Sequence, residues 1–183
     1  MGIAANIFEL LKDGTILSGN SKDEGIKRIV YTLSDEDNFK ENKKIFNELG
    51  FILIREYNCF YLTKQSNLND KELERFIKKY RDTFLALSIL KHFLPAISSG
   101  SELYKSDLIA KANNNKDTYI KETLEYLTKK EDNLSGSIEV VLKILREHRL
   151  IEQVDKKNED RHFVLDSMDY FNGILKQLEN SDA

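Results

Sequence analysis

The chain has 183 residues, of which 40% are hydrophobic and 32% charged, and its 28 basic and 31 acidic side chains give a net charge of −3. This length suits one large domain or two small ones. The charge balance excludes an overall basic coat but leaves room for a local basic patch. One proline and eight glycines argue against long linkers and against multi-stranded sandwiches, so the composition favours a helical protein.

Cysteine content and hydropathy indicate a compartment. Cys59 is the only cysteine, which excludes an internal disulfide framework and favours a reducing cytoplasm. The N-terminus lacks the basic and apolar regions of a signal peptide. The longest uncharged stretches, 83–90 and 92–101, fall short of the ~20 residues that a membrane span requires. We therefore expect a cytoplasmic protein.

The first predicted domain covers residues 1–66. Ser34 is the expected N-cap of its third helix, and Gly50 follows the end of that helix. After Gly50 the hydrophobic period changes from 3.6 to 2, which indicates a β-hairpin. This order is that of a winged helix, a helix-turn-helix followed by a hairpin. The predicted elements are helices over 3–11, 23–33 and 34–49, a short strand over 15–18, and hairpin strands over 51–55 and 59–63.

A long connecting helix is predicted within residues 67–98. Asn69 or Asp70 caps its start, and Pro95 ends it. In its second half, 84–94, apolar residues occupy most of the circumference, and such a helix is buried on most sides. We expect this half to be covered by a second domain or by a partner protein.

The second predicted domain covers residues 99–183 and repeats the order of the first. Its expected helix caps include Ser106, and its closing helix spans 167–178. The fold class is therefore mainly α with small β-hairpins (α+β), as tandem winged-helix domains joined by a long central helix. The other predicted elements are helices over 107–112, 117–127 and 138–148, a short strand over 101–104, and hairpin strands over 150–155 and 161–165.

The chemistry of the sequence does not point to an enzyme. It contains no phosphate-binding P-loop, no dinucleotide-binding glycine motif and no paired-cysteine or zinc-protease motif. The three histidines, His92, His148 and His162, are too widely spaced to indicate a metal site. We expect no catalytic residue, no metal and no cofactor.

Nucleic-acid contact is predicted only for the second domain. The third helix of the first domain begins with Asp35-Glu36-Asp37, and these acids would face phosphates or base acceptors. In the second domain, basic residues interleaved with acids allow either a solvated mixed-charge face or phosphate contact. Spacing predicts that 143, 146 and 149 form one ridge. The candidate DNA-binding residues are Lys129, Lys130, Lys143, Arg146, Arg149, Lys156, Lys157 and Arg161.

Apolar residues on the hairpin and on the long helix suggest a partner or dimer interface. Phe60 and Tyr61 are expected to be exposed on the hairpin, and Phe84, Leu87 and Phe93 lie on the apolar half of the helix. Large exposed apolar patches normally mark interfaces. We therefore expect self-association or a partner, and a homodimer is the simplest form of self-association.

Three stretches resemble a known family. Residues 7–21 (IFELLKDGTILSGNS), 42–53 and 57–62 (YNCFYL) are similar to the opening domain of the MukE and MksE small subunits of bacterial condensins. The small subunits of Wadjet-type plasmid-defence complexes are nearly as similar. The alternative is a free-standing winged-helix transcription regulator, which would need a basic recognition helix and a two-fold dimer.

The resemblance implies a non-enzymatic accessory subunit, nucleoid-associated in the cytoplasm. Such subunits bind a kleisin, the chain that bridges the two heads of an SMC ATPase, commonly dimerise, and help to hold DNA. The missing P-loop is consistent with an ATPase that resides in the SMC partner. The role would be chromosome organisation and segregation or plasmid defence, with weak, non-specific DNA binding by the subunit alone and no membrane contact.

Overall fold

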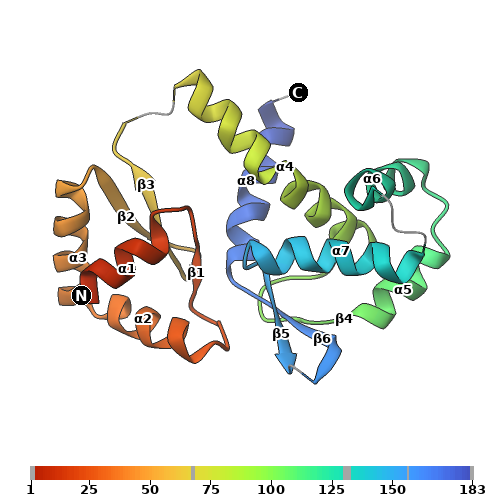
Figure 1. Cartoon of the computed structure of the whole chain (residues 1–183), viewed down its shortest axis with the longest axis horizontal. Coiled ribbons are helices and arrows are strands. Elements are labelled where there is room, and N and C mark those ends of the chain that lie inside the picture. Colours follow the sequence, from red (N-terminus) through yellow and green to blue (C-terminus); the bar gives the residue numbers. More distant parts are fainter. Residues whose placement is uncertain (1–2, 67–68, 130–132, 156, 182–183) are drawn as a thin grey trace.

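The structure, a computed structural model, describes residues 3–66, 69–129, 133–155 and 157–181. In these ranges the chain is a mixed α/β protein with eight helices and two three-stranded antiparallel sheets (Figure 1). The predicted class, mainly α with small hairpins, is confirmed at this level.

The first unit has the predicted element order. Its sheet has the strand order β1-β3-β2 and is antiparallel throughout. Tyr57 and Asn58 connect β2 to β3 with φ angles of 51° and 54°, as a two-residue turn requires when it matches the twist of its strands. The elements are α1 (Ile3–Leu11), β1 (Leu17–Ser18), α2 (Glu24–Ser34), α3 (Glu36–Glu48), β2 (Phe51–Glu56) and β3 (Cys59–Lys64).

Two local predictions for α3 were wrong. The N-cap is Asp35, whose carboxylate accepts from the Asn38 N–H at 3.0 Å, whereas Ser34 ends α2 and donates to the Val30 carbonyl. Both residue types are good caps, and the break between helices falls one residue later than expected. The apolar spacing of the predicted helix 34–49 also places Leu49 on its buried side with Phe46, but Leu49 is 54% exposed because it lies at the C-cap beyond the last turn of α3.

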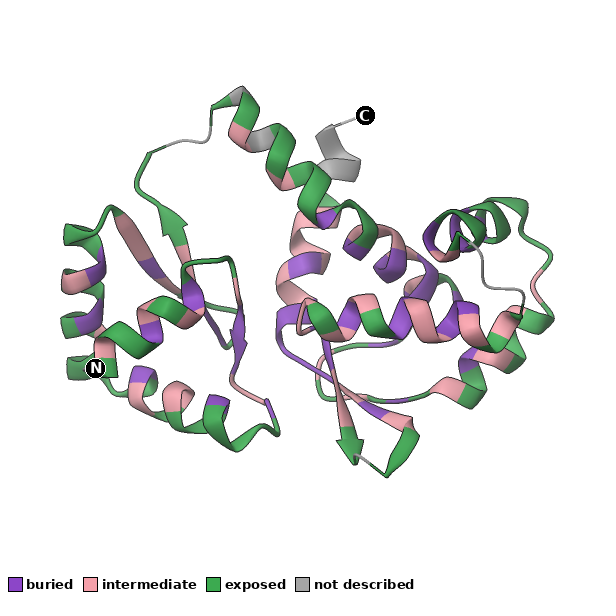
Figure 2. Cartoon of the chain, in the orientation of Figure 1, coloured by how far each residue is buried: buried purple, intermediate pink, exposed green. Residues whose placement is uncertain are grey.

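The long helix α4 (Asp70–Phe93) starts and ends as predicted. Asn69 caps it in a capping box with Glu72, and Pro95 follows its end. Figure 2 shows that the first half of α4 is mostly exposed, whereas the second half is largely buried. Helices α6 and α7 pack on that second half. The second unit, rather than a partner, therefore covers it.

The second unit contains three helices between its first strand and its hairpin. Its sheet has the order β4-β6-β5, which matches the first sheet. Arg149 (φ 55°) stands where Gly50 (φ 85°) stands in the first unit, in a left-handed conformation after the helix and before the hairpin. The elements are β4 (Glu102–Tyr104), α5 (Lys105–Asn113), α6 (Thr118–Thr128), α7 (Leu134–Glu147), β5 (Ile151–Asp155), β6 (Asn158–Val164) and α8 (Ser167–Ser181).

Several boundaries of the second unit differ from prediction, including the start of β6 at Asn158 rather than at 161. Helix α5 begins at Lys105, and Ser106 is not its cap, because the backbone N–H and hydroxyl of Ser106 both donate to the Asp160 carboxylate. Helix α7 begins four residues early, because the Asn133 side chain caps it by accepting from the Gly136 N–H. Leu150 is a buried connector, and the strand starts at Ile151.

The two units meet at a polar contact that we call the Asp166 junction. The Asp166 side chain is buried between β6 and α8 and accepts from the Asn20 backbone N–H (3.0 Å), the Asn58 side-chain amide (2.7 Å) and the Ser99 hydroxyl. In return, the Asn20 side-chain oxygen accepts from the Asp166 backbone N–H at 2.9 Å. These bonds fix the β1–α2 loop and the β2–β3 turn of the first unit against the second.

Candidate partner and nucleic-acid surfaces

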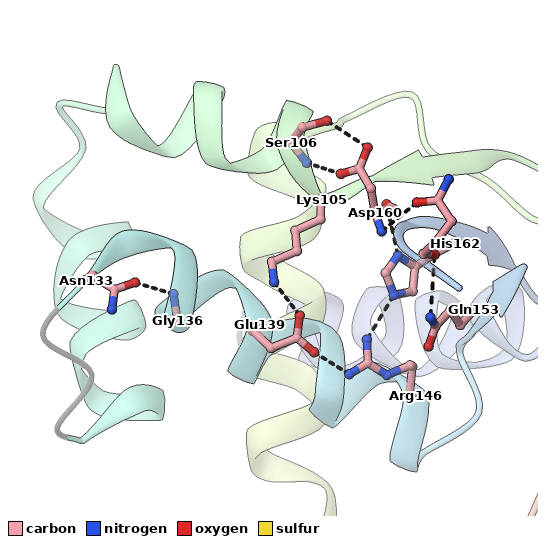
Figure 3. Close-up of polar contacts among 10 residues, drawn as sticks. Lys105, Ser106, Asn133, Gly136, Glu139, Arg146, Gln153, Asp160 and His162 are labelled. Atoms are coloured by element: carbon pink, nitrogen blue, oxygen red, sulfur yellow. Dashed lines mark hydrogen bonds and ion pairs between the residues drawn. The ribbon is translucent and has the colours of Figure 1, made fainter. Parts of the chain in front are cut away.

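Arg146, predicted to contact phosphate, lies in an internal charge cluster (Figure 3). Its guanidinium donates to the Glu139 carboxylate at 2.5 Å and lies 2.9 Å from Nε2 of His162. The other Glu139 oxygen accepts from the Lys105 ammonium at 2.7 Å. Burial alone would raise the pKa of Glu139, but hydrogen bonds from Lys105 and Arg146 hold it below its usual value. Glu139 therefore balances much of the charge of Arg146.

His162, at the centre of this cluster, is fully buried. Its Nδ1 faces the Asp160 carbonyl at 3.3 Å. Since Arg146 can only donate, the neutral ring accepts at Nε2 and donates from Nδ1. Burial first, and then the charge of Arg146, lowers the pKa of His162, which keeps the ring neutral. The cluster thus has a defined donor and acceptor at each position.

Arg161 is also paired within the chain. It lies on β6 opposite β4 and forms an ion pair with the Glu102 carboxylate, which also accepts from the Tyr104 hydroxyl. The hydrogen bond from Arg161 is the main cause that lowers the pKa of Glu102. Arg146 and Arg161 are therefore both paired with acids of the chain, and 143, 146 and 149 do not form one exposed ridge because Arg146 turns toward β6.

The remaining candidate cations lie at the surface. Lys143 is 65% exposed at its side chain and is 3.9 Å from Glu147, a separation at which an exposed pair contributes little. Lys129 and Lys157 are exposed at the end of α6 and in the β5–β6 turn, and Arg149 is half-buried. Lys130 and Lys156 lie outside the described residues. Of the predicted set, the described surface thus offers Lys129, Lys143 and Lys157 to phosphates.

The predicted partner residues lie inside the chain or against it. Phe60, Leu87 and Phe93 are buried, which corrects the expectation that Phe60 is exposed: strand alternation places it in the core of the first unit. Tyr61 points to the opposite face of the sheet and is half-buried against Tyr170, with ring centroids 4.8 Å apart. Phe84 is half-buried against Phe171 on α8.

The structure also has a cleft that the sequence did not predict, which we call the junction cleft. It has a volume of about 730 Å³ and lies between the face of the first sheet that bears Tyr61 and helices α4 and α8. Phe76 and Tyr80 lie on one side of α4 and indicate a covered face there. The sequence does not indicate which surface lies opposite that face. Its charged and aromatic lining comprises Lys12, Lys64, Arg75, Lys79, Asp13, Glu72, Phe51, Tyr61, Phe76, Tyr80, Tyr170 and Phe171.

The family of condensin complex protein MksE matches residues 3–175, which include both units and α4. The chain belongs to the MksE family of condensin complex proteins. The resemblance seen in the first 65 residues is thereby confirmed over both units, and an accessory subunit of an SMC-type complex is indicated. Comparison with curated proteins gave no match.

Within the described part of this MksE-family chain, no three His, Cys, Asp or Glu side chains gather as metal ligands would. Cys59 is buried with its sulfur 3.8 Å from the Ser18 hydroxyl, and burial raises the pKa of the thiol to about 12. Among the described helices, none is both long enough and apolar enough to cross a bilayer.

Proposed function

We propose that this MksE-family chain is a non-enzymatic accessory subunit of a bacterial SMC–kleisin complex, in the cytoplasm and associated with the nucleoid. It binds the kleisin and, through it, the SMC ATPase, for chromosome organisation and segregation or plasmid defence. The observation that carries this proposal is the family match over residues 3–175, because it includes both units rather than one common module.

We further propose that residues 1–66 and 99–183 are tandem winged-helix domains and that 67–98 connects them. Three features support this assignment. In each unit a short strand is followed by at least two helices and then by a hairpin. In each sheet the short strand pairs with the last strand. In each unit a left-handed residue, Gly50 or Arg149, precedes the hairpin.

Copurification tests the kleisin assignment. The chain is produced together with the kleisin encoded beside it, and the complex is analysed by gel filtration with light scattering. We expect a stable complex, a homodimer of the subunit alone, and no ATP turnover that follows the pure subunit through the column. Failure to bind the kleisin, or turnover that copurifies with the subunit, would refute the accessory role.

We propose that DNA contact, where it occurs, is made through phosphates by Lys129, Lys143 and Lys157. These three side chains are exposed in the second unit, and side chains that recognise bases are not required for such contact. Affinity should then be weak, independent of sequence and strongly dependent on salt. Each lost phosphate contact should reduce the slope of log affinity against log salt by about 0.9.

Fluorescence anisotropy with duplex DNA tests this surface. The variant K129E/K143E/K157E should lose binding, and the control K40E/K43E/K44E makes the same charge change on exposed positions of α3. Arg146 and Arg161 are left unchanged, because a Glu there would face Glu139 or Glu102 and destabilise the fold. If both triple variants lose binding equally, total charge rather than this surface is responsible.

A further inference from the structure

The walls of the junction cleft come from distant parts of the sequence and are tied together. The Lys79 ammonium donates to the Asp13 carbonyl at 2.6 Å, and the Tyr80 hydroxyl donates to the Gly14 carbonyl at 3.3 Å. Gly14 has a φ of 85°, and a Cβ there would lie 2.8 Å from the Tyr80 hydroxyl oxygen. These contacts fix the turn after α1 against α4, so the cleft is preformed.

The inner surface of the cleft is aromatic. Tyr80 packs on Phe76 and on Phe171, with ring centroids 4.7 and 5.6 Å apart. Tyr61 and Tyr170 continue this surface onto the sheet. Aromatic and aliphatic side chains of a ligand would displace water from such a surface, which is how most anchor residues bind.

The charged lining of the cleft is mainly basic. Four of its side chains are cationic and two are acidic, whereas the whole chain carries −3. Lys64 pairs with Glu72, and Lys12 pairs with Glu9 on α1. The hydrogen bond of Lys79 goes to a neutral carbonyl, and Arg75 is exposed. The cleft therefore favours a ligand that brings negative charge to its rim and apolar side chains to its interior.

We propose that the junction cleft binds an acidic segment of the kleisin that carries aromatic or aliphatic anchor residues. This proposal rests on the accessory function proposed above and locates its contact surface. A peptide fits better than nucleic acid because the volume of about 730 Å³ accommodates a few side chains. Proteins that bind single strands use long basic grooves that follow the backbone, and a duplex is too wide for the cleft.

Site-specific cross-linking tests the location. A photoreactive benzoyl-phenylalanine replaces Thr63, an exposed residue of β3 that lines the cleft, and the full-length kleisin from the same genome is the probe. The control carries the same group at Tyr31, which is 82% exposed on α2 and outside the cleft. We expect cross-links from position 63 to an acidic stretch of the kleisin and none from position 31.

Charge reversal tests the chemistry. K12Q/R75E should weaken kleisin affinity by about tenfold, because the cleft loses one positive charge and gains a repulsive one, while Gln at position 12 can still donate to Glu9. The control R28E/K44Q makes the same change in net charge on α2 and α3 and should stay within about twofold of the wild type, as distant exposed charges are screened. All four positions are exposed, and equal urea midpoints verify that both variants are folded.

The outcomes separate the two proposals. If the wild type binds the kleisin but K12Q/R75E binds it equally well, or the cross-links come from position 31 alone, the cleft assignment is wrong and the accessory function stands. If cross-links from position 63 form with DNA instead, the occupant is nucleic acid and the peptide proposal is overturned. If the wild type does not bind the kleisin, both proposals fail.

Discussion

Removal of the Asp166 carboxylate should weaken the contact between the two units. In Asp166→Ala, the Asn20 backbone N–H loses its acceptor at the interface, and a buried unpaired donor costs about 1–3 kcal/mol. The Asn58 amide and the Ser99 hydroxyl also lose a charged acceptor but can turn toward water. We therefore expect the free energy of unfolding to fall by about 2–4 kcal/mol.

A second substitution at this position separates geometry from charge. In Asp166→Asn, the amide oxygen still accepts from Asn20 and Asn58, and its NH₂ group donates to Ser99, whose hydroxyl can rotate to accept. The cost should be about 1 kcal/mol, because charge-assisted bonds become neutral ones. Asn20→Ala combined with Asp166→Ala should cost less than the sum of the single changes, with a coupling of about 0.5–3 kcal/mol.

Urea unfolding followed by circular dichroism measures these differences, with midpoint shifts converted to free energy through the slope of the transition. The matched control is Glu159→Ala, which removes an exposed carboxylate from β6 and should change stability by less than about 0.5 kcal/mol. If Asp166→Ala is no more destabilising than Glu159→Ala, the Asp166 junction does not stabilise the contact between the units, and the reasoning is refuted.

Three further predictions concern single residues. Cys59 should not react with a thiol reagent until the chain unfolds, because the thiol is buried and its pKa is raised to about 12; rapid labelling of the native protein would contradict this. Because the pKa of His162 is lowered in the folded state, the unfolded state binds a proton at a higher pH than the folded state does. Stability should therefore fall as the pH drops below about 6.5, by at most about 1.4 kcal/mol per pH unit for this histidine. His162→Gln keeps an acceptor for Arg146 and should reduce the fall, and urea midpoints at several pH values would show no difference if His162 were not responsible. Arg149→Gly should stabilise the fold by about 0.5–1 kcal/mol, because the residue has a φ of 55°, and an unchanged or lower midpoint would show that the Arg149 side chain compensates for the strain.

Local patterns predicted local structure well. The cap of α4 at Asn69 or Asp70, the hairpin after Gly50 and the buried second half of α4 each depend on residues close together in sequence. The structure confirms all three, with Asn69 as the cap. The start of α3 was placed one residue early because Ser34 and Asp35 are both good caps, and only the Asn38 contact distinguishes them.

Charge patterns predicted the candidate site poorly. Charge and position in the sequence alone do not show which of Lys143, Arg146 and Arg161 is exposed. The structure distinguishes them, because β4 brings Glu102 to Arg161 and Glu139 bridges Arg146 to Lys105. The Asp166 junction joins residues 146 positions apart, and the junction cleft depends on how the sheet lies against α4. Neither has a counterpart in local sequence spacing.

The burial of the second half of α4 under α6 and α7 has a consequence for how the chain can be divided. Leu87, Leu90 and Phe93 belong to the same hydrophobic cluster as Leu142 and Leu145 of α7. A fragment that begins at residue 99 would expose this apolar surface and should aggregate. A fragment that begins at Asn69 retains both the capping box and the helix. We therefore expect the autonomous folding unit of the second half to begin with α4, and a protease that cuts between β3 and α4 to release it intact.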